Sequence, residues 1–397
     1  MTLSVFKNKE TLSPDFPIEK YWEKIPHRAD QIRILWNLYG DVLDRAGTSF
    51  LRRLQIIGPA GSGKTCTLKF FGQTFEEEAK RRGIQLDHVY MNLKFEGGRR
   101  VIFFRNLVNK IEPRLVSASF SAEELLRSLI NYLQEAQRFI LLTVDEIDYF
   151  VRRFKKEGIV YDLTRLNELS NQPCGIMGIT FLARQKEFHD LLDPAELSTL
   201  GRLFIEFQPY SEDQILDILE RRAEEAFNPG AYTEKTLRFI ANITASRRIN
   251  GDLRYALDLL LYAGILADNL GSPRVLLDHV RRVNNQISPS LTTEDLLGLS
   301  DGSKVVLLAL IRSLSGDRPY ASLIEIRENV DVLCENYSLR PIKHVEEFLQ
   351  DLWDRQIIDL KSLMEIGISG APVADLDTFL DNIIERLRAE VSHAAPK

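Results

Sequence analysis

Cysteine is scarce in this chain, with three residues among 397, at Cys66, Cys174 and Cys334. Their odd number and wide separation fit neither a disulfide framework nor a zinc site built on paired cysteines. Histidine is almost as rare, and its six residues form no cluster with the spacing of metal ligands. This usage is typical of a protein that stays in a reducing compartment.

Long apolar runs are also missing. No stretch approaches the roughly 18 apolar residues that a membrane-spanning helix needs, and residues 305–311, among the longest, have the size of a core segment. The first ten residues, MTLSVFKNKE, lack the apolar centre of an export signal. We therefore expect a cytoplasmic protein with no membrane partner.

A positive net charge is the third absence. The chain carries a formal charge of −6, which does not indicate nucleic-acid binding by itself. Its distribution is uneven: residues 291–397 hold 11 lysines and arginines against 19 aspartates and glutamates, whereas the preceding residues hold 40 against 38. The acidity is therefore concentrated in the C-terminal quarter.

The clearest motif is the glycine-rich segment GPAGSGKT at residues 58–65, which fits the phosphate-binding loop pattern G-x-x-x-x-G-K-[ST]. The apolar residues 54–57 before it predict a buried strand, and residues 66–71 after it predict a helix. In that context Lys64 would reach the β- and γ-phosphates of ATP, and Thr65 would hold Mg²⁺. A chance glycine loop is the alternative. The predicted nucleotide-binding residues of the loop are Gly58, Pro59, Ala60, Gly61, Ser62, Gly63, Lys64, Thr65 and Cys66.

A second motif is the apolar run 139–144 that ends in Asp145 and Glu146. Such a run predicts a strand covered on both faces of a parallel sheet. Asp145 would act on the Mg²⁺ shell, and Glu146, with Lys64 the predicted catalytic residue, would polarise the attacking water. The alternative is an ordinary strand end with solvated carboxylates.

The order of predicted elements divides the chain into three domains. Strands alternating with helices predict a parallel α/β sheet in residues 1–208, with an N-terminal arm. Residues 209–290 predict a small helical domain. Residues 291–397 predict three helices followed by a β-hairpin, which is the winged-helix arrangement.

Together these features resemble the AAA+ ATPases, and more narrowly the archaeal origin-recognition and cell-division-control initiator family. The carriers are PHR at 26–28, the phosphate loop, VDEIDYF at 144–150, LDP at 192–194, GDLRYAL at 251–257 and the terminal winged helix. The resemblance covers nearly the whole chain and implies an AAA+ domain, a helical lid and a winged-helix domain. It also implies binding of ATP or ADP with Mg²⁺ and of double-stranded origin DNA. The implied partners are the replicative helicase or sister initiator subunits.

The resemblance assigns roles to residues that the motifs alone do not. His27 and Arg28 would lie near the adenine, and Arg254 would reach from the lid to the γ-phosphate as a second sensor. Read without the family, Arg254 is an arginine near a helix start that fits an ordinary surface charge. Residues 99–135 correspond to a helical insertion that touches DNA in the family. Its candidates are Arg99, Arg100, Arg105 and Lys110, although a charge run is more often a solvated face.

Two departures from the family pattern concern hydrolysis. Phe181 follows the strand that we expect to end at Thr180, where the family has a polar sensor, usually asparagine. Ala195 occupies the position from which the family offers an arginine to a neighbouring subunit's nucleotide. Losing such an arginine lowers the rate by roughly 10³-fold in other enzymes. We therefore expect ATP hydrolysis to be slow.

A further departure concerns the winged helix. Its predicted recognition helix, residues 341–356, contains Lys343 among several carboxylates, and Lys361 is the one lysine of the wing. Carboxylates facing DNA are repelled by phosphate. The wing therefore either grips DNA weakly or has become a protein-docking surface. The predicted function is an ATP-switched replication initiator. The alternative is a divergent paralogue that regulates through protein contacts, with structurally bound nucleotide and weak DNA binding.

Overall fold

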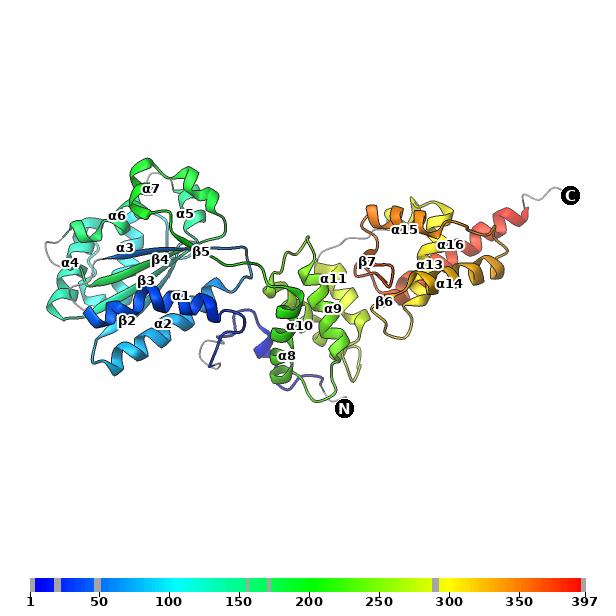
Figure 1. The fold of residues 1–397 in the computed structure, drawn as a ribbon, viewed down its shortest axis with the longest axis horizontal. Coiled ribbons are helices and arrows are strands. Elements are labelled where there is room, and N and C mark those ends of the chain that lie inside the picture. The colour runs from blue at the N-terminus through cyan, green and yellow to red at the C-terminus, as the bar shows by residue number, and fades with distance from the viewer. Residues whose placement is uncertain are drawn as a thin grey trace. The chain divides into compact units, whose positions relative to one another are not determined.

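The computed structural model describes residues 4–17, 23–45, 51–154, 157–169, 173–287 and 293–393 (Figure 1). The described residues fall into two compact units. One lies within Pro17–Tyr210, and the other combines residues of Met1–Phe16 with residues of Ser211–Lys397. No helix among these described residues is both long enough and apolar enough to cross a membrane.

Five parallel strands form the sheet of the first unit, in the order β2-β3-β4-β1-β5. The central strands are nearly continuous apolar runs because helices cover both of their faces. All residues of β4 are buried, as are all but the first of β3. The sheet is therefore the parallel α/β sheet that the sequence predicts. Its strands are β1 (Arg52–Ile57), β2 (Leu86–Asn92), β3 (Phe139–Asp145), β4 (Ile176–Ala183) and β5 (Phe204–Glu206).

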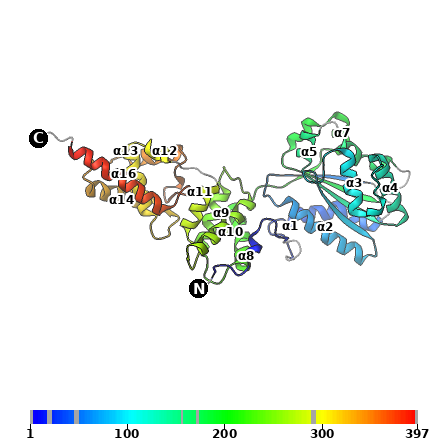
Figure 2. The same cartoon turned by 180° about the vertical axis from the view of Figure 1, so that it is seen from behind.

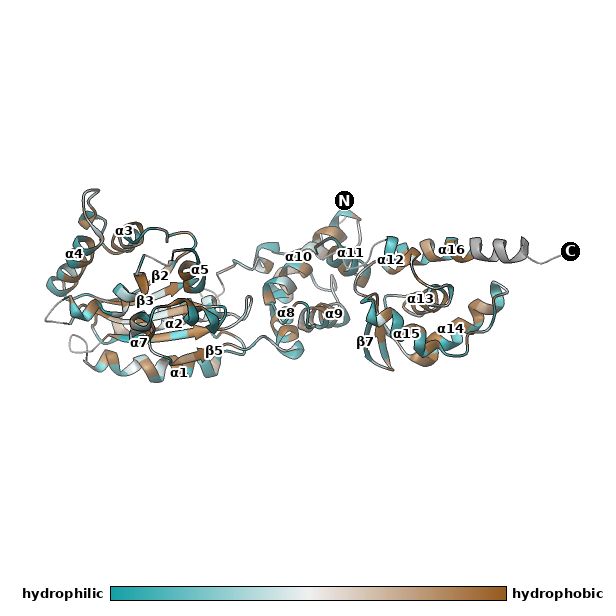
Figure 3. Cartoon of the chain, turned by 90° about the horizontal axis from the view of Figure 1, so that it is seen from above, coloured by the Kyte–Doolittle hydropathy of each residue, from teal (hydrophilic) through white to brown (hydrophobic). Residues whose placement is uncertain are grey.

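Two separate cores hold helices on the two faces of this sheet (Figure 2). One core joins α1 and α2 to the sheet, and the other joins α3 to α6 to the opposite face. In Figure 3 the strands lie between α3 and α4 on one side and α1 on the other. The spacing of Ser121 and Glu124 in the sequence predicts a capping box, and the structure confirms it at the start of α4. The helices are α1 (Ala29–Tyr39), α2 (Lys64–Arg81), α3 (Arg100–Ile111), α4 (Ala122–Glu135), α5 (Ile147–Arg153), α6 (Ile159–Thr164) and α7 (Pro194–Leu200).

Four helices form the helical domain of the second unit, and their ends lie within two residues of 212–226, 233–243, 251–268 and 275–286, the ranges that the sequence pattern predicts. The N-terminal residues pack here, with the ring of Phe6 stacked on that of Phe227 at 4.8 Å between centroids. The backbone N–H of Val5 donates to the Asp268 carboxylate at 2.6 Å. The arm that the sequence analysis places with the nucleotide-binding domain therefore lies on the helical domain, because its apolar side chains find their partners there. The helices are α8 (Glu212–Ala226), α9 (Glu234–Ala245), α10 (Leu253–Asn269) and α11 (Leu277–Ile287).

The C-terminal domain has helices around a small antiparallel sheet of order β6-β8-β7. The predicted three helices and hairpin are present, while β6 is too short to leave a pattern in the sequence. Helix α15 begins at Val345, so Lys343 and His344 lie before the helix, although the predicted range of 341–356 includes them. The elements are α12 (Thr293–Leu297), α13 (Asp301–Ser313), β6 (Tyr320–Ala321), α14 (Leu323–Asn336), α15 (Val345–Asp354), β7 (Asp359–Ser362), β8 (Glu365–Gly367) and α16 (Val373–His393).

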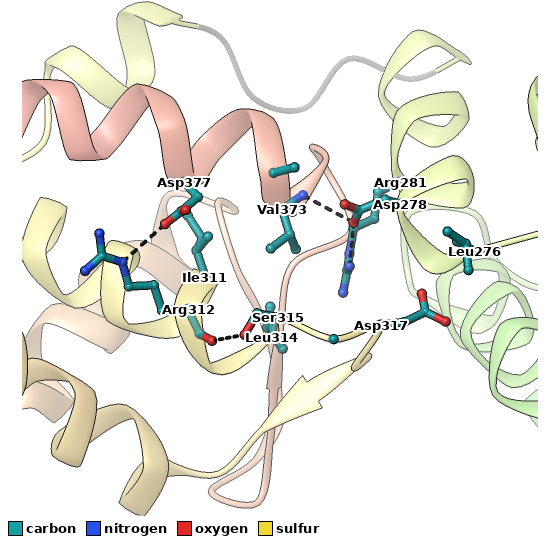
Figure 4. A pocket seen from close by; sticks show the side chains of 12 residues that line it. Leu276, Asp278, Arg281, Ile311, Arg312, Leu314, Ser315, Asp317, Val373 and Asp377 are labelled. Atoms are coloured by element: carbon teal, nitrogen blue, oxygen red, sulfur yellow. Dashed lines mark hydrogen bonds and ion pairs between the residues drawn. The ribbon is translucent and has the colours of Figure 1, made fainter. Parts of the chain in front are cut away.

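The helical and winged-helix domains meet around Arg281 of α11, which is 1% exposed. Its guanidinium donates to the carbonyls of Ile368 and Arg318 and to the Asp278 carboxylate, each at 2.9 Å. A pocket of about 330 Å³ lies beside it, bordered by the start of α16 at Val373 (Figure 4). Because the guanidinium bonds to main-chain carbonyls of the winged-helix domain, α11 is tied directly to that domain.

Candidate nucleotide site

The loop between β1 and α2 is packed so closely that its glycines are required. A Cβ on Gly58 would lie 2.3 Å from the Phe207 carbonyl oxygen. Gly63 has φ +81°, and a Cβ there would lie 2.4 Å from the Tyr210 hydroxyl. Residues that carry a side chain rarely adopt that backbone conformation, and a side chain at this position would have no space. The glycines of the sequence motif therefore set the shape of this loop.

Lys64 begins α2, and its ammonium points back into the loop. Its Nζ donates to the carbonyls of Gly58 at 2.6 Å and Pro59 at 2.8 Å, and the residue is 9% exposed. The Ser62 hydroxyl also donates to Pro59, at 2.9 Å. The loop thus combines a buried cation with the positive end of an 18-residue helix, which is the arrangement that binds phosphate.

Arg28 supports the loop through hydrogen bonds to its backbone. It is 3% exposed, and its Nε and Nη2 both donate to the Ser62 carbonyl, at 3.1 and 2.8 Å. Nη2 also donates to the Gln208 carbonyl, and the guanidinium lies 3.9 Å from the centre of the Tyr210 ring. Burial lowers the pKa of Arg28, and Tyr210 opposes that effect. His27 beside it is exposed, with φ +56°. The predicted adenine contacts of both residues stay predictions.

Asp145 ends β3 at the same edge of the sheet as the loop. Its Oδ2 accepts bonds from the Thr65 hydroxyl at 2.8 Å and the Tyr90 hydroxyl at 2.7 Å, and its Oδ1 accepts the Glu146 N–H at 2.7 Å. Burial and the Asp145 charge raise the pKa of Tyr90, so the phenol remains a donor. A hydroxyl and a carboxylate in contact are the hard oxygen ligands that Mg²⁺ prefers. The residues present therefore fit the predicted ion.

Glu146 lies next to Asp145 in the left-handed region, with φ +60°. Its Oε1 accepts a bond from Arg184 at 3.0 Å, and its Oε2 pairs with Lys94 at 3.1 Å. Burial acts to raise the pKa of Glu146, but the bonds from Arg184 and Lys94 outweigh it and hold that pKa below the usual range. Both oxygens of the predicted catalytic carboxylate are thus occupied by cations.

The predicted end of strand β4 at Thr180 is wrong, whereas the place of Phe181 at the family's sensor position stays a prediction. Strand β4 continues to Ala183, three residues beyond Thr180, and Phe181 is buried in the core with α3 to α6. Thr180 faces the opposite side, where its hydroxyl lies 3.0 Å from that of Tyr39. The first polar residue at the strand end is Arg184, because the apolar run is longer than the sequence analysis assumed.

Two other predicted positions are exposed in the first turns of helices. Ala195 is exposed in the first turn of α7, where Asp193 caps the helix. Arg254 is exposed in the first turn of α10, and its backbone N–H donates to Asp252. Arg254 belongs to the second unit, and its sensor role stays a prediction. Cys66 is half-buried in the first turn of α2, directly after Thr65.

The DNA candidates in the insertion differ in how they are bonded. Arg99 is exposed at the start of α3. Arg100 is held by Asp162, at 2.8 Å for one of its bonds, and by Glu123. Lys110 pairs with Glu96 at 2.6 Å and donates to the Tyr90 carbonyl. The predicted cations are therefore not equally available, and the partners of Arg100 and Lys110 lie within the fold.

The remaining cations show the same contrast. Arg105 is half-buried and donates to the Ala118 carbonyl at 3.4 Å. Lys361 of the wing pairs with Glu212 of α8 at 3.2 Å and lies over the Tyr320 ring. Lys343 is exposed just before α15. Lys343 and Lys361 are thus both exposed, but Lys361 is held in an ion pair.

Sequence reasoning missed Lys94, Arg184 and Tyr90 as residues around the acidic centre. Arg184 had a signal, since it is the first polar residue after the apolar run 176–183. Lys94 and Tyr90 had none, because their approach to Asp145 and Glu146 depends on the pairing of β2 with β3.

Comparisons with known proteins agree with this architecture. A family model described as an AAA domain matches residues 52–192, and one for the Cdc6 AAA+ ATPase-type lid domain matches residues 216–285. The ORC1-type DNA replication protein 2 of Saccharolobus solfataricus is 30% identical over 357 residues, covering 88% of this chain and 84% of that protein. The ORC1-type DNA replication protein of Pyrococcus abyssi is 32% identical over 368 residues, covering 90% and 84%.

Solved structures extend the likeness to the whole fold. Cdc6p from Pyrobaculum aerophilum gives a TM-score of 0.78 at 25% identity, covering 97% of this chain and all of that one. The Aeropyrum pernix ORC1 protein, solved in complex with DNA, gives 0.61 at 26% identity, covering 98% and 100%. With identity at this level over most of both chains, and with the same AAA domain, lid and winged helix, this chain belongs to the archaeal ORC1/Cdc6-type family of AAA+ replication initiators.

Proposed function

We propose that this protein is an ATP-binding replication initiator that binds duplex DNA at an origin and helps recruit the replicative helicase. Slow ATP hydrolysis acts as its conformational switch. The observation that carries the proposal is the contact between Thr65, at the start of α2, and Asp145, at the end of β3, beside the buried ammonium of Lys64. Residues far apart in sequence thereby meet at one strand edge, which supports a shared site for phosphate and metal.

Each residue of this site has a separate task. The loop backbone and the N-terminus of α2 bind the phosphates, and Lys64 adds a positive charge at the β- and γ-phosphates. Thr65 and Asp145 would hold Mg²⁺, which neutralises charge on the phosphates when it is bound. Glu146, which directly follows Asp145, would orient water, and Ala195 offers no arginine to a neighbouring copy. This combination favours retention of nucleotide over rapid turnover.

Measurements of nucleotide binding and of ATP turnover distinguish the roles of Lys64 and Glu146. Lys64→Ala should weaken ADP binding at least about tenfold, because a buried cation facing the phosphates is lost. Glu146→Gln should leave binding within about twofold and abolish residual ATP hydrolysis. Calorimetric titration and a phosphate-release assay measure the two quantities. Turnover by the isolated protein near the roughly 1–100 s⁻¹ of kinases would contradict a retention role.

DNA binding is supported by the Aeropyrum pernix relative, whose structure is a complex with DNA. Among the predicted DNA-binding residues, Arg99 in the insertion and Lys343 before α15 are exposed. Footprinting on the host's own origin DNA tests the proposal, and a protected, sequence-specific site is the expected result. Arg99→Glu and Lys343→Glu should each lower duplex affinity in a fluorescence anisotropy titration, and should flatten its dependence on salt by about one phosphate contact. Unchanged affinity in both variants would refute this placement.

A second candidate function is a regulator that acts through protein contacts. It is favoured by the turn between β7 and β8, where Leu363 is 62% and Met364 67% exposed, and by the pairing of Lys361 with Glu212. An apolar turn flanked by a bonded lysine suits a protein partner better than phosphate. If the protein leaves origin DNA unprotected and yet pulls down initiator or helicase subunits, and Leu363→Ser with Met364→Ser abolishes that capture, this second function replaces the first.

A further inference from the structure

The loop at residues 93–99, between β2 and α3, carries an unusually exposed aromatic ring. Phe95 is 86% exposed, whereas no other large apolar side chain in the part of the chain that the structure describes exceeds 67%. A single exposed apolar residue is common on protein surfaces. The surroundings of Phe95 therefore decide whether the ring has a role.

Hydrogen bonds hold this loop in place. The Asn92 carbonyl accepts the backbone N–H of Phe95 at 3.1 Å and that of Glu96 at 2.8 Å. The Asn92 side chain accepts the Lys94 N–H at 2.9 Å, and the Asn106 side chain donates to the Glu96 carbonyl at 3.1 Å. The ring is thus presented to solvent by a bonded loop, so that little ordering is needed when a ligand binds it.

Helix α5 lies beside the loop and extends the same surface. At one end of the loop, the Lys94 ammonium lies 5.4 Å from the centre of the Tyr149 ring of α5. At the other end, the Arg100 backbone N–H donates at 2.6 Å to Glu157, which follows α5 in the chain. Tyr149 is 38% exposed, so the helix adds a second ring.

The exposed side chains of these two segments are all aromatic or cationic. Their carboxylates are turned inward, since Asp148 is buried and Glu96 is half-buried in an ion pair of 2.6 Å with Lys110. Arg99, Arg152 and Arg153 form no ion pair with any residue that the structure describes. We name the exposed set the aromatic–cation surface, and its members are Lys94, Phe95, Arg99, Tyr149, Arg152 and Arg153.

This composition selects a class of ligand. Arginine binds phosphate, and an aromatic ring stacks on the face of a base. In a duplex the faces of the bases are stacked on one another, whereas an unpaired strand offers both its bases and its phosphates. Alternating rings and free cations therefore match a strand in which flat apolar groups alternate with negative charges.

We propose that the aromatic–cation surface binds an unpaired nucleic-acid strand, with Phe95 stacked on a base and with Arg152 and Arg153 on phosphates. This activity goes beyond the duplex binding proposed above and does not depend on it. Arg99 also belongs to the predicted duplex contacts, so the test uses the other members of the surface.

An anisotropy titration of the full chain with a fluorescein-labelled oligothymidine of about 15 nucleotides, near the upper end of common site sizes, tests the proposal. Phe95→Ser should weaken binding about tenfold, which is within the range for loss of one stacking ring. Phe95→Trp should keep the affinity, and oligothymidine should quench the added tryptophan emission. Arg152→Glu combined with Arg153→Glu should weaken binding and flatten its salt dependence by about two phosphate contacts.

A matched control is Leu203→Ser. Leu203 is 65% exposed and precedes β5, at the opposite edge of the sheet from β2. This variant should bind oligothymidine like the wild type. Phe95→Ser should leave ADP binding and duplex affinity within about twofold of the wild-type values, because the ring lies outside both predicted sites.

The outcomes are distinct. Absence of oligothymidine binding by the wild type, or equal affinities of the wild type and Phe95→Ser, overturns the proposal. Equal weakening of duplex and oligothymidine in Phe95→Ser also overturns it, as does loss of helicase capture with oligothymidine affinity unchanged, which would make the surface a protein-docking site. Oligothymidine binding that depends on Phe95, in a protein that leaves origin DNA unprotected, supports this inference while the proposed function fails.

Discussion

Substitution of Arg28 tests whether this residue holds the phosphate loop in place or contacts the adenine base of the nucleotide. Its guanidinium bonds twice to Ser62 and once to Gln208, and it lies against the Tyr210 ring. Arg28→Met leaves the buried Ser62 carbonyl and the partly buried Gln208 carbonyl without this donor, at up to about 1–3 kcal/mol each. It also loses a cation–π contact of about 0.5–2 kcal/mol. We therefore expect the free energy of unfolding to fall by about 3–5 kcal/mol, since methionine recovers part of the packing.

Nucleotide binding gives the second part of this test. If Arg28 holds the loop, Arg28→Met should weaken ADP and tripolyphosphate, which has no base, by a similar factor of about ten or more. Calorimetric titration of ADP and competition by tripolyphosphate measure both, and urea denaturation measures stability. Arg33→Met is the matched control, because its ion pair with Asp30 in α1 is exposed. A loss confined to ADP, with stability unchanged, would refute the loop-holding role and favour the adenine contact.

Two further predictions concern groups whose surroundings are set by the first unit. His88 bonds to the Thr143 hydroxyl at 2.8 Å, and burial lowers its pKa to about 4, with a smaller effect from Lys69. The unfolded chain takes up a proton near pH 6.5 and the folded protein does not, so stability is complete above pH 6.5 and should fall by roughly 3 kcal/mol towards pH 4. His88→Gln should flatten that part of the profile in urea denaturation at successive pH values, and an unchanged slope would contradict the assignment. Arg100→Glu should lower the melting temperature, because Asp162 loses its partner and faces a like charge; equal melting temperatures for this variant and the wild type would show that the pair is unimportant.

Local patterns were enough to predict much of the fold and part of the site. Apolar runs gave the positions of β1 and β3, because strands covered on both faces need little else. The capping boxes at Ser121 and Ser211 gave helix starts, since one side chain satisfies the free N–H groups there. The loop and Asp145 were predicted together because the carboxyl ends of parallel strands lie at one edge of the sheet.

What local patterns missed depends on where strands end and on which side chains meet across them. The predicted end of β4 at Thr180 was wrong because Phe181 to Ala183 continue the buried run. The pairing of Lys94 with Glu146 joins residues 52 positions apart, through the register of β2 on β3. No periodicity within either segment contains that information. The arm at residues 4–16 was placed with the wrong neighbour for the same reason, since Phe227 lies far along the chain.

Contacts between residues far apart in sequence also determine which cations of this chain are available to bind DNA. In the insertion, Arg100 and Lys110 form ion pairs with carboxylates of the same domain, and in the wing Lys361 pairs with Glu212. A lysine or arginine that is paired with a carboxylate neutralises a DNA phosphate, and so displaces a counterion from the DNA, only if its ion pair is first broken. Such cations therefore add little to affinity. Exposed cations such as Arg99 and Lys343 should therefore contribute more to DNA affinity than the paired cations, so the total number of positive residues is a poor measure of that affinity.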